Sequence, residues 1–266
     1  MGEVWGEFDP GDSISCHIQN NLIRDRFMAS MNKSEVDIQK AYYAETATRY
    51  NEMHVNEDDE HFFALSFMVG ILDYLKIGSI LDIGSGTGRV IKYIKEKRPA
   101  IMIVGIEPVK EMREIGYQLG ISRTELFEGD ALNLQFKNGE FDLVCAFGVL
   151  HHIKTPEIAI SEMLRVAKKA IFLSDSNNFG QGSLIARIFK QLINLFGLWK
   201  VANFVKTKGK GYTLSDEDGL SYSYSLFNNY QQIKRECKII NLLNTKGGAI
   251  NLYRTASHVA LLGQKR

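Results

Sequence analysis

The sequence predicts an α/β fold in which helices cover a mostly parallel sheet. Two observations support this prediction. Short, wholly apolar runs alternate along the chain with stretches of helical period. The run at 80–83 is followed at once by three glycines at alternate positions, and a helical pattern begins directly after them. A strand, a glycine turn and a helix in this order bring backbone N–H groups close to a ligand, which is typical of nucleotide-type sites.

Length and composition narrow the class of protein. The 266 residues, 45% hydrophobic and 24% charged, suffice for one α/β domain with additions, and a net charge of +1 argues against a nucleic-acid partner. Cys16, Cys145 and Cys237 are far apart and odd in number, so neither a disulfide framework nor a zinc site is expected. No apolar run reaches the roughly 18 residues of a membrane span, and no signal-peptide core is present. A cytoplasmic protein is the expectation.

The N-terminal part divides near residue 33. Residues 1–33 show no steady period and are interpreted as an extension that is poorly ordered or foreign to the native protein. The domain is then expected to span 34–266, with two N-terminal helices within 34–76. Ser34 and Asp37 form an acidic capping box before a helix to about residue 51, and a second helix is predicted at about 61–75.

The spacing of the glycines distinguishes two cofactors. Gly84, Gly86 and Gly88 follow the pattern G-x-G-x-G, whereas the third glycine of a dinucleotide fingerprint would fall at Arg89. Asp82, two residues before the first glycine, would repel a pyrophosphate. It would attract the positive amino and sulfonium groups of S-adenosylmethionine. The loop therefore favours S-adenosylmethionine, and a nucleotide-dependent oxidoreductase remains the competing enzyme class.

Two motifs connect the chain to a known family. The run Leu81-Asp-Ile-Gly-Ser-Gly-Thr-Gly88 resembles the first motif of class I S-adenosylmethionine-dependent methyltransferases. Phe-Asp-Leu-Val at 141–144, followed by Leu-His-His at 150–152, resembles the methyltransferase type 11 group, which includes quinone-ring C-methyltransferases and sugar O- and N-methyltransferases. The resemblance covers about residues 40–176. It implies a Rossmann-like, seven-stranded sheet whose last strand is antiparallel, with strands at 80–83, 101–106, 125–128, 141–147, 169–175, 238–243 and 257–262.

The resemblance also implies which residues bind the cofactor. Glu107, about 20 residues beyond the glycines, would hold the ribose hydroxyls, and Asp130 would accept from the adenine amino group. Tyr50, on a Tyr-rich helix, would cover the cofactor, whereas Tyr42 and Tyr43 equally suit packing against the sheet. A helix-dipole carboxylate and a plain turn residue are the alternatives for Glu107 and Asp130. The candidate cofactor-binding residues are Tyr50, Asp82, Gly84, Ser85, Gly86, Gly88, Glu107, Pro108, Asp130, Ala131 and Phe147.

The candidate catalytic residues follow the fourth and fifth strands. His151 and His152 come after the fourth strand, where ligands bind in open α/β sheets, and one of these two adjacent residues is expected to be structural. Asp175, at the end of the fifth strand, is placed to orient a histidine that acts as a base. Metal-dependent relatives need carboxylates at both strand ends, but Ala146 and Phe147 end the fourth strand here. No metal is therefore expected.

Residues 180–224 depart from the family pattern and are predicted to form a helical cap. Residues 184–199 are too apolar for one exposed helix face, several Lys and Arg residues follow, and no acidic residue occurs between Asp175 and Asp216. Three interpretations remain open: a lid over an apolar acceptor, an interfacial helix that meets anionic lipid at 184–210, and a packed helix pair with solvated lysines.

The function predicted from the sequence is methyl transfer from S-adenosylmethionine to O, N or C of a small, partly apolar acceptor, leaving S-adenosylhomocysteine. The sulfonium is already activated, so the protein would supply proximity, desolvation and a base where the acceptor needs one. A non-catalytic, cofactor-binding protein that acts through its basic cap is the alternative outside the enzymes. An intact cofactor pocket without an acceptor cavity would favour that alternative. The sequence leaves the oligomeric state open.

Overall fold

The fold was established from a computed structural model that describes residues 34–54, 59–216, 218–248 and 250–266. The expectation for residues 1–33 lies outside this described part. The two predicted N-terminal helices are present as α2 (Glu35–His54) and α3 (Glu60–Ile71). Ser34 and Asp37 form the expected cap, since the Ser34 hydroxyl bonds the Asp37 carboxylate and accepts from the Asp37 backbone N–H at 3.2 Å.

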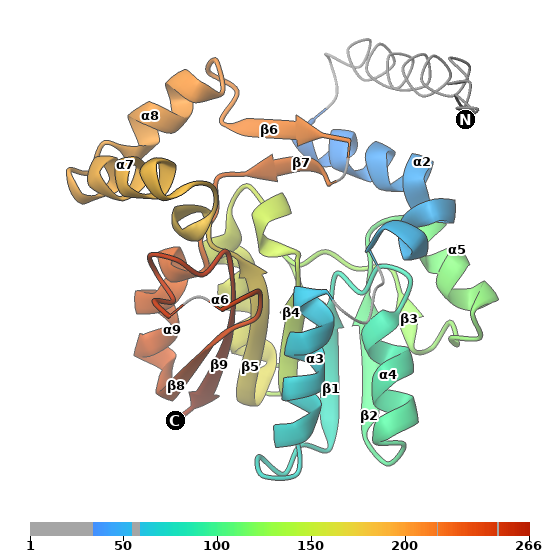
Figure 1. The fold of residues 1–266 in the computed structure, drawn as a ribbon. Helices are drawn as coiled ribbons and strands as arrows, with labels where there is room; N and C mark the ends of the chain where they lie inside the picture. The colour runs from blue at the N-terminus through green and yellow to red at the C-terminus, as the bar shows by residue number, and fades with distance from the viewer. Residues whose placement is uncertain (1–33, 55–58, 217, 249) are drawn as a thin grey trace, which may run out of the picture.

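The core is a seven-stranded sheet with the strand order β3-β2-β1-β4-β5-β9-β8 (Figure 1). β1, β2, β3, β4 and β5 pair in parallel, and β9 runs antiparallel to both β5 and β8. These strand directions confirm the predicted Rossmann-like sheet with one antiparallel strand. The apolar residues of its central strands, such as Leu81 and Ile83, are buried because helices cover both faces. The strands are β1 (Ser79–Ile83), β2 (Met102–Ile106), β3 (Leu126–Phe127), β4 (Phe141–Phe147), β5 (Ala167–Ser176), β8 (Cys237–Asn244) and β9 (His258–Lys265).

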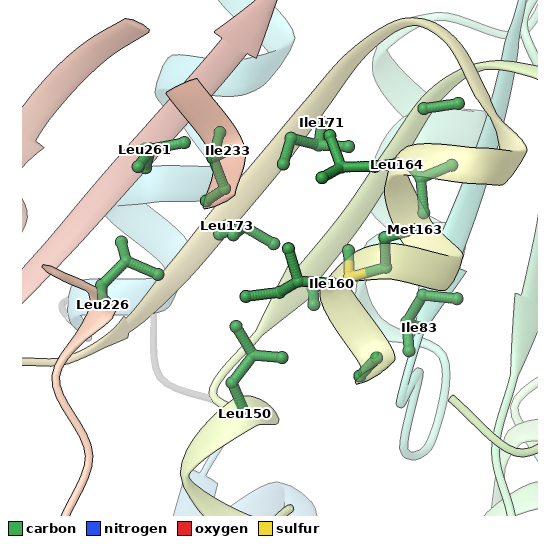
Figure 2. Packing of buried hydrophobic residues seen from close by; sticks show 14 of the residues in the cluster. Ile83, Leu150, Ile160, Met163, Leu164, Ile171, Leu173, Leu226, Ile233 and Leu261 are labelled. Carbon is green, nitrogen blue, oxygen red and sulfur yellow. The ribbon is translucent and has the colours of Figure 1, made fainter. Parts of the chain in front are cut away.

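Helices cover both faces of the sheet. α3 and α4 (Arg89–Lys97) pack with Ile80, Leu143 and Phe172 in one apolar cluster, while α6 (Pro156–Val166) and α9 (Tyr230–Glu236) pack in another. Figure 2 shows Ile160 and Met163 of α6 against Leu173. α5 (Lys110–Gln118) packs against α2 near β3, the edge strand of the sheet. The carboxyl ends of β1, β2, β4 and β5 therefore stay open towards a ligand.

A hairpin that was not predicted covers this edge of the sheet. β6 (Tyr212–Ser215) and β7 (Gly219–Tyr222) form a separate two-stranded sheet beside α2 (Figure 1). The Leu220 N–H donates to Gln39 Oε1 at 2.5 Å, the Tyr42 hydroxyl donates to the Asp216 carbonyl at 2.9 Å, and Tyr222 bonds Glu35 at 3.0 Å. α2 and the hairpin together are called the roof below.

The cap contains the expected helix pair, α7 (Leu184–Leu195) and α8 (Trp199–Lys206), which extends beyond the sheet in Figure 1. Neither helix has a buried residue. Among the described helices, none combines the length and the apolar content that crossing a membrane requires.

Candidate functional site

The glycine turn joins β1 to α4 in a conformation that needs glycine. Gly84, Gly86 and Gly88 have φ values of +66°, +57° and +87°. A Cβ atom at Gly88 would lie 2.0 Å from Ile121 Cδ1, so a larger residue here would also force the end of that side chain to move. A Cβ at Gly86 would meet nothing closer than 3.4 Å, from Met112 and Tyr50. Gly86 is buried, with the Tyr50 side chain directly beside it.

Glu107 connects the end of β2 to the glycine turn. Its carboxylate is buried and accepts hydrogen bonds from the Gly86 N–H at 3.0 Å and the Val109 N–H at 2.9 Å. Burial raises the pKa of Glu107, while the two N–H donors and Arg113 act in the opposite direction. Each carboxylate oxygen keeps a lone pair, so the group is suited to accept from a pair of hydroxyls as well.

Asp82 holds an unsatisfied buried oxygen. The residue is 1% exposed, Oδ1 accepts a weak bond from Cys145 Sγ at 3.6 Å, and Oδ2 has no hydrogen-bond partner among the described residues. Burial raises the pKa of Asp82 to about 7. An unpartnered buried carboxylate is costly, and a positively charged ligand group would compensate it. The site therefore fits the cationic end of S-adenosylmethionine.

Three tyrosines of α2 have different surroundings. Tyr50 lines the cavity described below, and burial raises its pKa to about 12. The Tyr43 ring lies edge-on to that of Tyr50, with centroids 5.9 Å apart, and its hydroxyl is 3.0 Å from His152 Nε2. Tyr42 is buried under the hairpin. Tyr42 thus has structural contacts, Tyr43 both contacts His152 and lines the cavity, and Tyr50 lies over the glycine turn.

The other candidate cofactor-binding residues differ in burial and in their position relative to the cavity. Ser85 turns inward and donates to the Asp82 carbonyl at 3.1 Å, and Phe147 lines the cavity. Pro108 is exposed, Ala131 is half-buried, and the exposed Asp130 accepts from the Leu132 N–H at 2.9 Å as a turn residue. Like Asp82, Glu107 and the glycines of the turn, the residues Pro108, Asp130 and Ala131 are outside the cavity lining. Their contacts with an adenine ring remain predictions.

A cavity of about 750 Å³ lies at the open ends of β4 and β5. Its volume is within the range of small-molecule sites. Apart from Phe147, Gly148 and several tyrosines, the lining residues are polar or charged. They come from α2, α3, the start of α4, the β4 and β5 ends, α8, the hairpin and the start of β9, and include Tyr50, Arg89, His61, His151, Ser176, Asn203, Lys206, Asp218 and His258.

His151 lies between two carboxylates. Its Nδ1 is 2.8 Å from Asp175 Oδ1, and its Nε2 is 3.0 Å from Asp218 Oδ2. Asp175 is 1% exposed and is fixed by the backbone N–H groups of Leu150 and Ser176. The predicted contact between Asp175 and a histidine is therefore present, while the catalytic role stays a prediction.

The charges of this cluster follow from its contacts. Burial lowers the pKa of His151, but Asp175 and then Asp218 outweigh it and raise the value to about 10. Burial raises the pKa of each aspartate, but the histidines prevail and hold both values below the usual range. Near neutral pH the cluster thus consists of an imidazolium between two carboxylates.

His152 occupies the structural position that was expected of one histidine. Its Nδ1 is 2.6 Å from the Leu220 carbonyl, which fixes a proton on that nitrogen, and its Nε2 is near Tyr43 and 3.3 Å from Asp218 Oδ1. His151 lines the cavity and His152 does not. The polar atoms of His151, His152 and Asp218 lie within 4.8 Å of one another, a grouping that the sequence did not predict because Asp218 belongs to the hairpin.

A second group on the cavity wall was also missed by the sequence analysis. His258 Nε2 is 3.1 Å from Glu60 Oε1, Lys246 is 3.2 Å from the same carboxylate, and His61 Nδ1 is 3.0 Å from Ser174. Burial lowers the pKa of His61 to about 4, so this ring is neutral. These residues come from α3, β9 and the segment after β8, and no local motif connects them.

Comparisons with known proteins agree with this geometry. Residues 81–173 match a family described as methyltransferase domain. Norajmaline N-methyltransferase of Rauvolfia serpentina is 38% identical over 94 residues, which are 34% of this chain and 32% of the relative. Demethylmenaquinone methyltransferase of Deinococcus radiodurans is 34% identical over 91 residues, 33% of this chain and 37% of the relative. The match thus spans about a third of the length of these relatives.

The fold is shared with solved structures. Magnesium protoporphyrin IX methyltransferase from Synechocystis, solved with bound S-adenosylhomocysteine (SAH), has a TM-score of 0.56 and 16% identity. The similarity covers 88% of this chain and 100% of that chain. Taken together with the strand order and the glycine turn, the comparisons show that residues 81–173 are similar to a methyltransferase domain and that the chain has the Rossmann-like fold of a solved methyltransferase.

Proposed function

We propose that the protein transfers a methyl group from S-adenosylmethionine to a nucleophilic atom of a small-molecule acceptor. The observation that supports this best is the single cavity lined both by Tyr50 and Arg89, at the glycine turn, and by His151 and Asp218, under the hairpin. A cofactor and an acceptor in one cavity can meet without intervening water, and such proximity is the main requirement of methyl transfer.

The cofactor half of the site is assigned to the residues around the glycine turn. S-adenosylmethionine would supply an electrophilic methyl group on a positively charged sulfur. Asp82 would compensate its positive groups, and the Glu107 carboxylate would accept from the ribose hydroxyls while it keeps its bonds to the Gly86 and Val109 N–H groups. Asp130 and Ala131 would contact the adenine.

His151 is the proposed base for a hydroxyl acceptor. Asp175 holds Nδ1, so a proton from the acceptor would go to Nε2, where Asp218 Oδ2 lies in this structure. An acceptor hydroxyl would replace Asp218 at that atom. Once this carboxylate moves away, one of the influences that raise the His151 pKa is lost, although the larger influence of Asp175 stays, and the ring acts as a base in its neutral form. An amine or an activated ring carbon would need the base less.

The cavity indicates the chemistry of the acceptor. Polar and charged residues dominate the lining, and the apolar residues of α7 are not part of it. The expectation of an apolar lid over the acceptor therefore does not match this arrangement. We infer that the reacting part of the acceptor is polar, such as a hydroxyl or amine, and that any apolar part lies outside the cavity.

The alternative functions fit less well. A dinucleotide-dependent oxidoreductase is disfavoured because Arg89 begins α4 in place of the third fingerprint glycine. A cofactor-binding protein without catalysis would need no acceptor space, whereas this cavity extends from Tyr50 to Tyr222 and His258.

Ligand-dependent thermal stability tests the proposal. SAH at about 100 times its dissociation constant should stabilise the protein by about 2.7 kcal/mol and raise Tm by about 5 °C or more. NAD at the same concentration should leave Tm unchanged. A rise with NAD and none with SAH would refute the proposal. A screen with S-adenosylmethionine labelled at the methyl group would then identify the acceptor.

A further inference from the structure

The apolar side chains of α7 and α8 face solvent. Eleven of the 21 large hydrophobic residues that are exposed in the described part of the chain fall between positions 184 and 205. Their exposed fractions range from 48% at Leu192 to 81% at Ile185. The residues are Leu184, Ile185, Ile188, Phe189, Leu192, Leu195, Phe196, Leu198, Val201, Phe204 and Val205, and they are called the apolar cap face. So many exposed apolar residues on two consecutive helices are typical of an interaction site.

The polar side of α7 is the side attached to the protein. Gln191 Nε2 donates to the Phe179 and Arg254 carbonyls at 3.1 and 2.9 Å, and Asn194 donates to the Tyr253 hydroxyl at 2.9 Å. Lys190 donates to the Gln181 carbonyl at 2.9 Å. A surface helix normally buries its apolar side and exposes its polar one. α7 has the opposite orientation: its polar side faces the protein and its apolar side faces solvent, where a partner can bind it.

The positive charges near the apolar cap face indicate which kind of partner would bind it. Lys200, Lys206, Lys208 and Lys210 are exposed, and no acidic residue occurs from 176 to 215. A second copy of the chain in a symmetric contact would bring these like charges together. An anionic lipid surface offers both opposite charge and an apolar layer, and amphipathic helices with Phe, Leu and Lys bind such surfaces.

We propose that the apolar cap face docks on an anionic lipid bilayer, with its Ile, Leu, Val and Phe side chains in the acyl boundary and the lysines among the headgroups. α8 also lines the cavity through Asn203 and Lys206, and Thr207 does so directly after the helix, so docking brings the cavity close to the bilayer. The substrate class then follows, on the basis of the proposed methyl transfer. The acceptor is a membrane amphiphile that places its polar group in the cavity and leaves its apolar part in the lipid.

Vesicle co-sedimentation of the full chain tests the docking. The parent should bind vesicles of phosphatidylcholine with phosphatidylglycerol at low salt, and should bind less at high salt or to pure phosphatidylcholine. Ile185→Gln with Phe189→Gln and Leu195→Gln should lower binding about tenfold or more. Lys200→Gln with Lys208→Gln and Lys210→Gln should do the same, while Lys206 is left intact because it lines the cavity.

Matched controls separate the cap face from general surface effects. Tyr74→Gln with Leu119→Gln removes exposed apolar residues elsewhere, and Lys92→Gln with Lys137→Gln and Lys168→Gln removes exposed charges elsewhere. These controls should bind like the parent. The SAH thermal shift should be unchanged in all variants, which shows that they remain folded.

Three results would overturn the docking. The first is that the parent fails to bind anionic vesicles at low salt. The second is that the cap variants bind as well as the controls. The third is that sedimentation velocity shows a parent dimer, which the apolar substitutions dissociate, and that no vesicle binding is seen. Failure of the proposed function gives a different result, because vesicle binding would persist without an SAH shift or methyl transfer.

Discussion

His151 Nε2 lies 3.0 Å from Oδ2 of Asp218, a residue 67 positions later in the chain that belongs to the β6–β7 hairpin. Because Asp175 holds the other ring nitrogen, one imidazole connects the end of β5 to the roof over the cavity. The charge of this ring therefore affects both the stability of the roof and the chemistry proposed beneath it.

Stability should fall at alkaline pH through His151. Its pKa is 6.5 in a model peptide and about 10 in the folded protein, so the stabilisation is complete below pH 6.5 and is lost as the pH rises towards 10. The slope should approach, at most, about 1.4 kcal/mol per pH unit. The lowered pKa values of Asp175 and Asp218 act on the acid side, where their stabilisation is lost as the pH falls below about 3.8.

Urea unfolding across this alkaline range measures the slope. Asp218→Asn removes one carboxylate and should make the slope shallower, whereas Asp216→Asn, at a neighbouring exposed position, should not. Equal slopes for the parent and Asp218→Asn would show that Asp218 does not influence the His151 pKa.

The two histidines should differ in catalysis. Once the screen has identified a hydroxyl acceptor, His151→Gln should lower turnover by about 10²-fold or more and leave SAH affinity intact. His152→Gln should have a smaller effect, because His152 does not line the cavity and is held by the Leu220 carbonyl and the Tyr43 hydroxyl. Initial rates and calorimetry measure the two quantities. Full activity of His151→Gln would mean that catalysis needs no base there.

Glu107 should control cofactor affinity. Glu107→Ala removes a charged acceptor from the Gly86 and Val109 N–H groups and from the proposed ribose hydroxyls, each bond being worth about 1–3 kcal/mol. SAH affinity measured by calorimetry should fall on the order of tenfold or more. Glu111→Gln, at an exposed position of α5, is the matched control. Unchanged affinity in Glu107→Ala would exclude the assignment.

The Asp82 carboxylate should lower the stability of the unliganded protein and raise its affinity for S-adenosylmethionine. Its pKa rises from 3.8 to about 7 on folding, so the buried carboxylate destabilises the protein above pH 4, increasingly up to about pH 7. Asp82→Asn should therefore stabilise the unliganded protein at pH 8, by on the order of 2–4 kcal/mol. It should also weaken S-adenosylmethionine binding. A variant that loses stability while it binds as well as the parent would contradict both expectations.

The strands of the sheet could be predicted because each is encoded by a short stretch of neighbouring residues. Each buried strand is a short apolar run, and the glycine turn follows from backbone conformations that only glycine adopts easily, as at Gly88. The resemblance to a family then supplied the number of strands and the antiparallel direction of the last one, and the structure added the strand order. The roles of the cofactor residues at Asp130 and Ala131 stay predictions.

The roof and its residues could not be predicted, because they depend on distant contacts. The hairpin strands have four residues each, and their positions are fixed by α2, for instance through Tyr42 and Asp216, which are 174 positions apart. Asp218 was therefore missed, and with it the reason for choosing between His151 and His152. Periodicity likewise predicted an amphipathic α7 but not its orientation, which depends on bonds such as Gln191 to Arg254.

The roof also implies that cofactor and acceptor affect each other's binding affinity. α2 places Tyr50 over the glycine turn, the hairpin places Asp218 beside His151, and the bonds from Gln39 and Tyr222 join these two segments into one element. An acceptor that displaces Asp218 acts on the same element that covers the cofactor. The free energy by which the acceptor changes cofactor affinity must equal that by which the cofactor changes acceptor affinity. A change in the α2–hairpin contact would therefore alter both affinities together.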